Sequence, residues 1–157
     1  MQRRAARLAA VQALYQWEQG GGGASAIIRE FTEHRIGKNV DGTELPPADL
    51  RLFGDLVQGA IANMAELDDM IAGVLTEDWS IERLESILRA ILRCGAYELA
   101  HRSDIPPKAA ISEYLAVADA FLGEPETRLA NGVLDRLAHS LRPGEMGEAR
   151  GGPAASR

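Results

Sequence analysis

Arginines at the start of the chain are the residues best suited to bind another molecule. Arg3, Arg4 and Arg7 open a run with no acidic residue before Glu18, although the 157-residue chain has a formal net charge of -6. Guanidinium groups pair with phosphate oxygens, and cations in the first turn of a helix oppose its macrodipole at a cost of about 0.3–1 kcal/mol each. A phosphate backbone would offset that cost. The cluster therefore predicts nucleic-acid binding, with a solvated helix face as the competing interpretation.

Two aromatic residues farther along the same run could add base stacking. Tyr15 and Trp17 follow the arginines by two to four helical turns, and aromatic rings stack on unpaired bases. Core packing is the alternative use, and it is favoured for Trp17. For Tyr15 both uses remain open.

The other reactive residues form no recognisable catalytic or metal-binding set. Cys94 is the only cysteine, and together with His34, His101 and His139 it offers neither a disulfide nor a zinc site. The glycines at 20–23 lack the lysine and hydroxyl residue of a phosphate-binding loop. Cys94 itself lies in an apolar stretch where a buried, inert thiol is expected. We therefore expect no catalysis, no metal and no cofactor.

Length and composition indicate one soluble domain. A chain of 157 residues, 46% hydrophobic and 25% charged, has the usual size of a single core. The acidic excess argues against a general polyanion binder, so nucleic-acid contacts should be confined to a patch. No apolar run reaches the roughly 18 residues that span a bilayer, and the N-terminus lacks the apolar segment of a signal peptide. We expect a cytoplasmic protein without membrane contact.

The arginines belong to a predicted helix over residues 3–17, which is rich in alanine, leucine, arginine and glutamine. A 3.6-residue period places Leu8, Val11, Leu14 and Tyr15 on an apolar stripe and Ala5 and Ala9 on the other side. Arg4 and Arg7 precede that stripe by one turn and point the same way. Because charged groups cannot enter an apolar core unpaired, this helix start is expected to overhang the body or fray.

Six more helices are expected, and no segment alternates with period two, so the fold class is all-α. Glycine and proline signals place them near residues 24–35, 48–61, 64–75, 80–99, 107–121 and 125–141. The third and fourth should meet at a kink, and the fifth, with Ser80 as its N-cap, should be central.

Two segments are expected to lie outside the helices, one a connection and the other a tail. The polar connection over 37–47 has a length that allows mobility and could serve as an interaction loop. The domain is predicted to cover 1–142, and 143–157 should be a disordered tail with nothing to bury.

Glycines inside two predicted helices indicate close helix packing. Gly95 and Gly132 each cost about 1 kcal/mol relative to alanine, a cost that a close helix-helix approach would offset. Asn131, beside Gly132, is then a polar residue fixed on a helix, available to cap a neighbour or to contact RNA.

Several motifs in order resemble the NusB family of transcription antitermination factors. They are Ala10-Val-Gln-Ala-Leu-Tyr15, Ile87-Leu-Arg-Ala-Ile-Leu-Arg-Cys-Gly-Ala-Tyr-Glu-Leu99, Arg102-Ser-Asp-Ile-Pro-Pro-Lys108, Ile111-Ser-Glu113 and Asn131-Gly-Val-Leu-Asp-Arg136. The resemblance covers both ends of the domain, while residues 20–80 are much less distinctive. It implies an all-helical fold of two small bundles and a non-catalytic role.

The resemblance also implies partners and site residues. Family members bind the boxA element of nascent, single-stranded RNA together with the ribosomal protein NusE, within the transcription elongation complex, and support ribosomal RNA synthesis. The RNA surface carries over onto positions in the first helix, in the Pro-Pro-Lys segment and at the start of the seventh helix. Its members here are Arg3, Arg4, Arg7, Tyr15, Lys108, Arg128, Leu129 and Asn131.

Four positions depart from the family pattern. Leu129 and Ala130 stand where phenylalanine and valine are usual, Ser112 where asparagine is usual, and Leu88 where an acidic residue is common. Without an aromatic ring, Leu129 loses a stacking platform worth about 1–3 kcal/mol per base. We therefore expect weaker or more partner-dependent RNA binding, while all four replacements suit a helix.

Two alternatives remain open. The protein could be a helical protein-protein adaptor whose arginines dock on an acidic partner without RNA. It could also be a truncated relative of the NusB-like domain of ribosomal RNA methyltransferases, since the chain has no room for a cofactor-binding α/β domain. The sequence also leaves open whether the chain forms a homodimer and which helices meet the partner protein.

Overall fold

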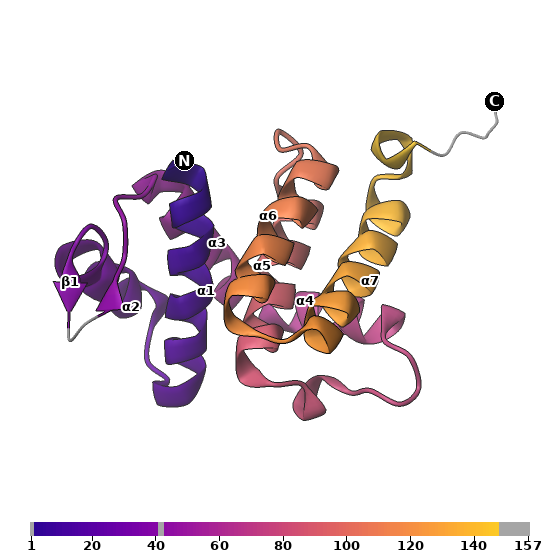
Figure 1. The fold of residues 1–157 in the computed structure, drawn as a ribbon, viewed down its shortest axis with the longest axis horizontal. Coiled ribbons are helices and arrows are strands. Elements are labelled where there is room, and N and C mark those ends of the chain that lie inside the picture. The colour runs from indigo at the N-terminus through magenta and orange to yellow at the C-terminus, as the bar shows by residue number, and fades with distance from the viewer. Residues whose placement is uncertain (1, 41–42, 148–157) are drawn as a thin grey trace.

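The structure is a computed structural model, and it describes residues 2–40 and 43–147. Its elements are α1 (Gln2–Gly20), α2 (Ala24–Glu30), the π-helical turn η1 (Phe31–Arg35), β1 (Asn39–Val40), β2 (Thr43–Glu44), α3 (Leu50–Ala62), α4 (Met64–Val74), the 3₁₀ turn η2 (Ile81–Arg83), α5 (Ser86–His101), α6 (Pro107–Phe121), α7 (Glu124–Leu141) and the 3₁₀ turn η3 (Pro143–Met146). Helices α1 to α3 form one bundle and α4 to α7 a second beside it (Figure 1). The all-α class is confirmed, with one short hairpin added.

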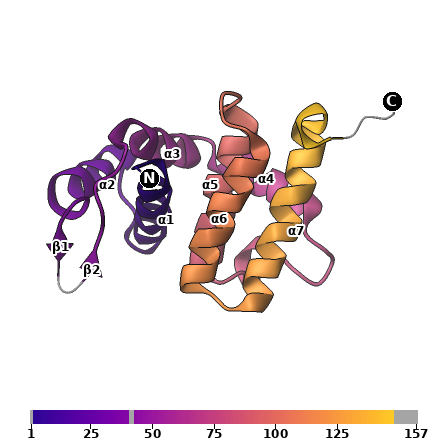
Figure 2. The same cartoon turned by 45° about the horizontal axis from the view of Figure 1, so that its top comes forward.

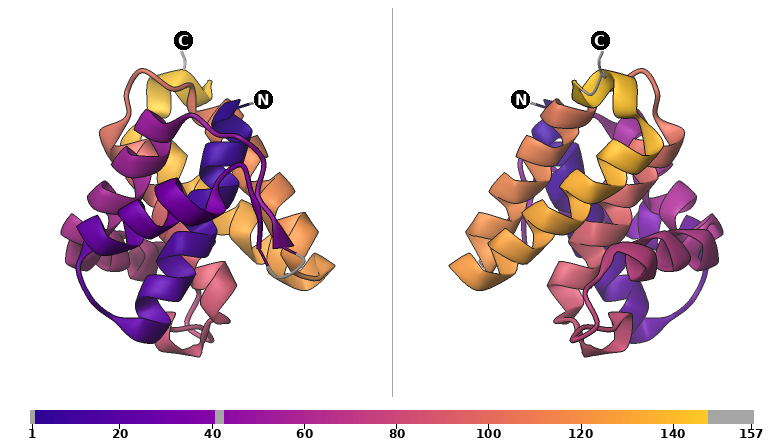
Figure 3. Two further views of the ribbon diagram at one scale, coloured as in Figure 1. Left: turned by 90° about the vertical axis from the view of Figure 1, so that its left-hand side faces the viewer. Right: turned by 90° about the vertical axis from the view of Figure 1, so that its right-hand side faces the viewer.

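Helix α5 is the central helix, as its apolar circumference predicts. It packs against α1 and α3 of the first bundle and against α4, α6 and α7 of the second, and every residue from 91 to 99 is buried. Figure 3 shows α7 closing the side of the second bundle that lies away from α1. Burial around α5 therefore holds the two bundles together.

The cap predicted for α5 is wrong. The chain is extended at Leu84, so the helix does not continue from Ser80, which precedes only η2 and makes no side-chain cap bond. Helix α5 begins at Ser86, where the carboxylate of Glu85 accepts a hydrogen bond from the Ile87 N–H at 2.5 Å. The side chain of Leu84, at this break, is buried in the core.

Helix α1 is buried over a wider surface than one apolar stripe. Ala5 and Ala9 are buried, whereas Leu8 is half-buried and Tyr15 is exposed. The predicted division into an apolar side and an alanine side is therefore wrong. It fails because α3, α5 and α6 all pack against α1, and alanines let these neighbours approach closely.

Close helix packing was predicted at two helix-interior glycines, and the structure confirms it at one of them. A Cβ on Gly95 would lie 2.8 Å from Cδ2 of Leu134, so α5 and α7 approach closely there. At Gly132 the nearest atom, on Arg136, would be 3.6 Å away, and the prediction of close packing is wrong for this residue. The tightest approach was not predicted: a Cβ on Gly59 would overlap the ring of Tyr97.

The connection over 37–47 contains an antiparallel hairpin of β1 and β2 that the sequence did not predict. Ile36 and Leu45 at its base are buried, and the Gly37 N–H donates to the Leu45 carbonyl at 2.7 Å. Gly37 has a φ of +80°, which an L side chain rarely adopts. Two buried anchors thus join this connection to the core.

The kink predicted between α3 and α4 lies at Asn63.

The end of the described chain also contributes to the core. Met146, in η3, is buried and the turn packs against α6 and α7. The expectation that residues after 142 bury nothing is therefore wrong for this turn, and residues 148–157 of the predicted tail lie outside the described residues. None of the described helices is long and apolar enough to cross a membrane.

Candidate nucleic-acid interface

Three of the predicted site residues lie at one end of the molecule. Helix α6 begins beside the start of α1 (Figure 1), and a hollow of about 360 Å³ between them is lined by Arg3, Arg4, Arg7, Ile105, Pro106, Ala109 and Glu113. Arg3 in α1 and Lys108 in α6 are exposed, and neither forms an ion pair within the described part of the chain. We call Arg3, Arg4 and Lys108 the cationic end.

Arg4 is held by a carboxylate at the surface. Its Nε and Nη2 donate to the two oxygens of Glu113 on α6, at 2.8 and 3.0 Å, and these bonds hold the pKa of Glu113 below its usual range. The Arg4 side chain is still 65% exposed, so solvent screening leaves the pair with little effect on stability. A phosphate group arriving from solvent can therefore replace Glu113 as the partner.

Arg7 is inside the protein, which corrects the expectation that the whole helix start overhangs. Its Nε and Nη2 donate to the carboxylate of Glu98 on α5 at 2.7 and 3.0 Å, and the residue is only 5% exposed. The hydroxyl of Tyr114 on α6 donates to the same carboxylate at 2.5 Å. The guanidinium can be buried because a carboxylate neutralises it, a partner 91 residues away in the sequence.

The buried cluster of Arg7, Glu98 and Tyr114 raises the pKa of two titratable groups in and beside it. Burial first, and then the Glu98 charge, raises the pKa of both the Tyr114 hydroxyl and the Cys94 thiol. Cys94 is fully buried, as predicted. Among residues 2–40 and 43–147, no group of three or more His, Cys, Asp or Glu could hold a metal ion.

We expect the Cys94 thiol to be unreactive in the folded protein. A buried thiol with a raised pKa carries almost no thiolate at pH 8, and the thiolate is the reactive form. Titration with a chromogenic disulfide should therefore give no thiol signal under native conditions and one equivalent in denaturant. Rapid reaction of native protein, with unchanged circular dichroism, would contradict the buried position.

Tyr15 faces the same way as Arg4 along α1. A separation of about 11 positions makes close to three helical turns, or a rise of about 16 Å, and Tyr15 is 38% exposed. Its ring is therefore available to a ligand that runs along α1 on the side of α6. Trp17 packs partly against the core, as favoured, and its Nε1 donates to the Gly22 carbonyl at 2.8 Å.

The predicted residues of α7 lie far from the cationic end. Helices α6 and α7 are antiparallel, so α7 begins at the opposite end of the second bundle (Figure 1), and α6 alone spans about 22 Å. Arg128 is exposed, with a 3.4 Å pair to Glu124, and Asn131 is exposed. The predicted residues at the cationic end and those at the start of α7 thus form two separate groups, and Tyr15 belongs to neither, because it lies on α1 about three turns from Arg4.

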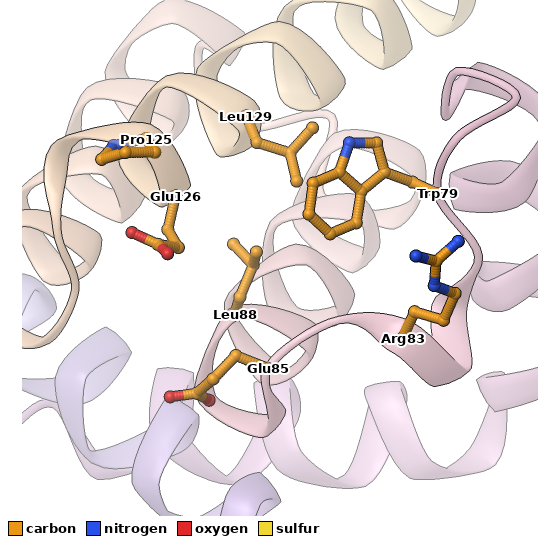
Figure 4. Close-up of a pocket in the computed structure, with 7 residues that line it drawn as sticks. All are labelled: Trp79, Arg83, Glu85, Leu88, Pro125, Glu126 and Leu129. Carbon is orange, nitrogen blue, oxygen red and sulfur yellow. The ribbon is translucent and has the colours of Figure 1, made fainter.

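Leu129 borders a hollow of about 210 Å³, together with Trp79, Arg83, Glu85, Leu88, Pro125 and Glu126 (Figure 4). Trp79 is 44% exposed and presents its indole beside Leu129. No motif in the sequence indicated a role for this tryptophan. An exposed aromatic ring therefore does lie beside Leu129, although Trp79, which supplies it, comes from the segment between α4 and α5.

Two other surface residues were missed beside the cationic end. Glu113, the partner of Arg4, appeared in a motif but had no assigned role. Arg51 lies in the first turn of α3 and shares a hollow with Arg3. Only an unpaired positive charge in the first turn of a helix could have indicated Arg51 from sequence.

Comparison with known proteins decides the family. The sequence pattern of the NusB family matches residues 4–139. The chain belongs to the NusB family. Transcription antitermination protein NusB of Brucella ovis is 49% identical over 146 residues, covering 93% of this chain and 83% of that protein. The NusB of Caulobacter vibrioides is 46% identical over 140 residues, covering 89% and 94%.

Solved NusB structures share the fold. A structure of T. maritima NusB has a TM-score of 0.74 at 31% identity, covering 93% of this chain and 96% of that one. A crystal structure of antitermination factors NusB and NusE in complex with double-stranded RNA has a TM-score of 0.72 at 26% identity, covering 87% and 96%. The arrangement of the bundles is therefore that of NusB proteins.

Proposed function

We propose that the protein is a transcription antitermination factor that binds boxA-type single-stranded RNA together with NusE, within the transcription elongation complex, and so supports ribosomal RNA transcription. The observation that carries the proposal is the cationic end, Arg3, Arg4 and Lys108, on a chain of the NusB family. The role is binding without catalysis, in the cytoplasm where nascent RNA is made. A related complex of NusB and NusE with RNA supports it.

The RNA path that fits these positions starts at the cationic end. Arg3 and Lys108 meet phosphates directly, and Arg4 exchanges Glu113 for a phosphate. The strand then follows α1 past Tyr15, which offers a stacking face, and reaches Arg128, Leu129 and Asn131 at the start of α7. Arg7 takes no phosphate in this proposal, because its guanidinium is committed to Glu98.

Removing the two surface arginines should change the salt dependence of binding. Each phosphate contact on single-stranded RNA contributes about 0.7 to the slope of log K against log salt concentration. The double variant Arg3→Ala/Arg4→Ala should therefore flatten the slope by about 1.4, measured by fluorescence anisotropy with a labelled boxA-type RNA. Arg29→Ala on α2, an exposed arginine outside the hollow, is the matched control and should leave the slope unchanged.

Sequence preference needs a separate titration, since phosphate contacts carry no sequence information. A boxA-type RNA and a scrambled RNA should be compared with and without NusE, and we expect the preference for boxA to be larger when NusE is present. Equal affinity for both RNAs under every condition would leave only the adaptor hypothesis. Pull-down of partners with and without nuclease would then test that hypothesis.

A further inference from the structure

The starts of α1 and α3 are tied together beside the cationic end. The Asp49 N–H donates to the Gln2 carbonyl at 3.0 Å, and Figure 2 shows the two helices side by side where the chain begins. A hollow of about 280 Å³ lies between them, lined by Arg3, Asp49, Arg51, Leu52 and Arg102. Arg3 borders both this hollow and the one shared with α6, so the two are adjacent.

The carboxylates around this second hollow are already bonded to donors. Asp49 caps α3 through a 3.0 Å bond from the Leu52 N–H. Arg102 is neutralised by Asp104, with bonds of 3.1 and 3.0 Å, and by Asp55 at 2.8 Å. Three guanidinium groups and one carboxylate thus line the hollow. Of the three, the Arg102 guanidinium is neutralised by its two aspartate partners.

Arg51, like Arg3, lines this hollow without a carboxylate partner among the described residues. It is exposed, and within residues 2–40 and 43–147 it makes no hydrogen bond or ion pair. The first turn of α3, like that of α1, holds no acidic residue. Its long side chain therefore stands free in the hollow that it shares with Arg3.

We propose that Arg51 binds a phosphate of the RNA strand and extends the cationic end from α1 onto α3. The proposal rests on the proposed RNA-binding function and adds one contact to it. Arg3 is the common border, so a strand that meets Lys108 and Arg3 reaches Arg51 next. We assign this contact to the RNA backbone, because guanidinium groups pair with phosphate oxygens and no aromatic side chain in the described part of the chain lines the hollow.

The test uses the full chain and a labelled boxA-type RNA titrated by anisotropy over a series of potassium chloride concentrations. Arg51→Ala should flatten the salt slope by about 0.7, and Arg3→Ala/Arg51→Ala by about 1.4. Affinity at low salt should fall about twofold to fivefold for the single variant. Arg51→Lys keeps the charge and should keep the slope, while Arg29→Ala controls for net charge.

The outcomes separate this inference from the function on which it depends. If Arg3→Ala flattens the slope and Arg51→Ala does not, RNA binding stands and the assignment of Arg51 is overturned. If the unaltered protein binds neither RNA, the proposed function fails first. A scrambled RNA should lose affinity by the same factor on Arg51→Ala, because a phosphate contact is blind to sequence; a loss confined to boxA would also overturn the backbone assignment.

Discussion

Replacing Glu98 with alanine is expected to lower the free energy of unfolding by about 3–5 kcal/mol, because it leaves the buried Arg7 guanidinium without a counter-charge. Arg7 donates two hydrogen bonds to this carboxylate and Tyr114 donates a third. Glu98 has no exposed surface, so water cannot replace the lost acceptor. Urea unfolding followed by circular dichroism measures the change.

The surface pair provides the matched control. Glu113→Ala removes an equally bidentate partner from Arg4, but Arg4 remains solvated, so the expected loss is far smaller than that of Glu98→Ala. A combined Arg7→Met/Glu98→Leu/Tyr114→Phe variant should recover most of the stability, since the apolar replacements leave neither an unpaired charge nor an unpaired hydroxyl. Equal losses for Glu98→Ala and Glu113→Ala would show that burial does not govern the Arg7 pair.

Gly59→Ala is expected to destabilise the protein by about 1–3 kcal/mol, the usual cost of overpacking. The new Cβ would overlap the Tyr97 ring. That ring cannot move freely, because its hydroxyl donates to Asp55 at 2.8 Å and it stacks on His101 with centroids 5.1 Å apart. Burial also raises the pKa of Tyr97 to about 12, so the hydroxyl remains a donor at neutral pH.

Gly54 on the same helix is the control for Gly59. A Cβ there meets no atom within 4 Å, so Gly54→Ala should stabilise α3 by about 0.5–1 kcal/mol. The two substitutions are thus expected to have opposite signs in thermal or urea unfolding. In a Tyr97→Leu background the cost of Gly59→Ala should shrink; an unchanged cost would place the strain elsewhere.

Much of the fold could be predicted because its helices are strongly periodic. The central place of α5 followed from apolar residues around its circumference, and the break before α6 followed from Pro106 and Pro107. The pairing of β1 with β2 and the cap at Glu85 could not be predicted. Both depend on where buried anchors, Leu45 and Leu84, must sit once distant helices have packed.

The site was predicted less well than the fold, and Arg7 shows why. Periodicity correctly placed its side chain on the inward side of α1, but the inference that this excludes burial assumed an apolar neighbour. Its neighbour is Glu98, 91 residues later, and sequence alone does not pair residues across helices. The separation of Arg3 from Leu129 was missed for the same reason, because it depends on the antiparallel order of α6 and α7.

The buried cluster of Arg7, Glu98 and Tyr114 lowers the entropy cost of RNA binding at the start of α1. It fixes α1 against α5 and α6 one turn from Arg3 and Arg4, so the backbone that carries these arginines is ordered before any RNA arrives. Binding then need not order that backbone, and only side-chain rotamers lose freedom. The helix start is thus preorganised, a property that a frayed arginine-rich segment of the same composition would lack.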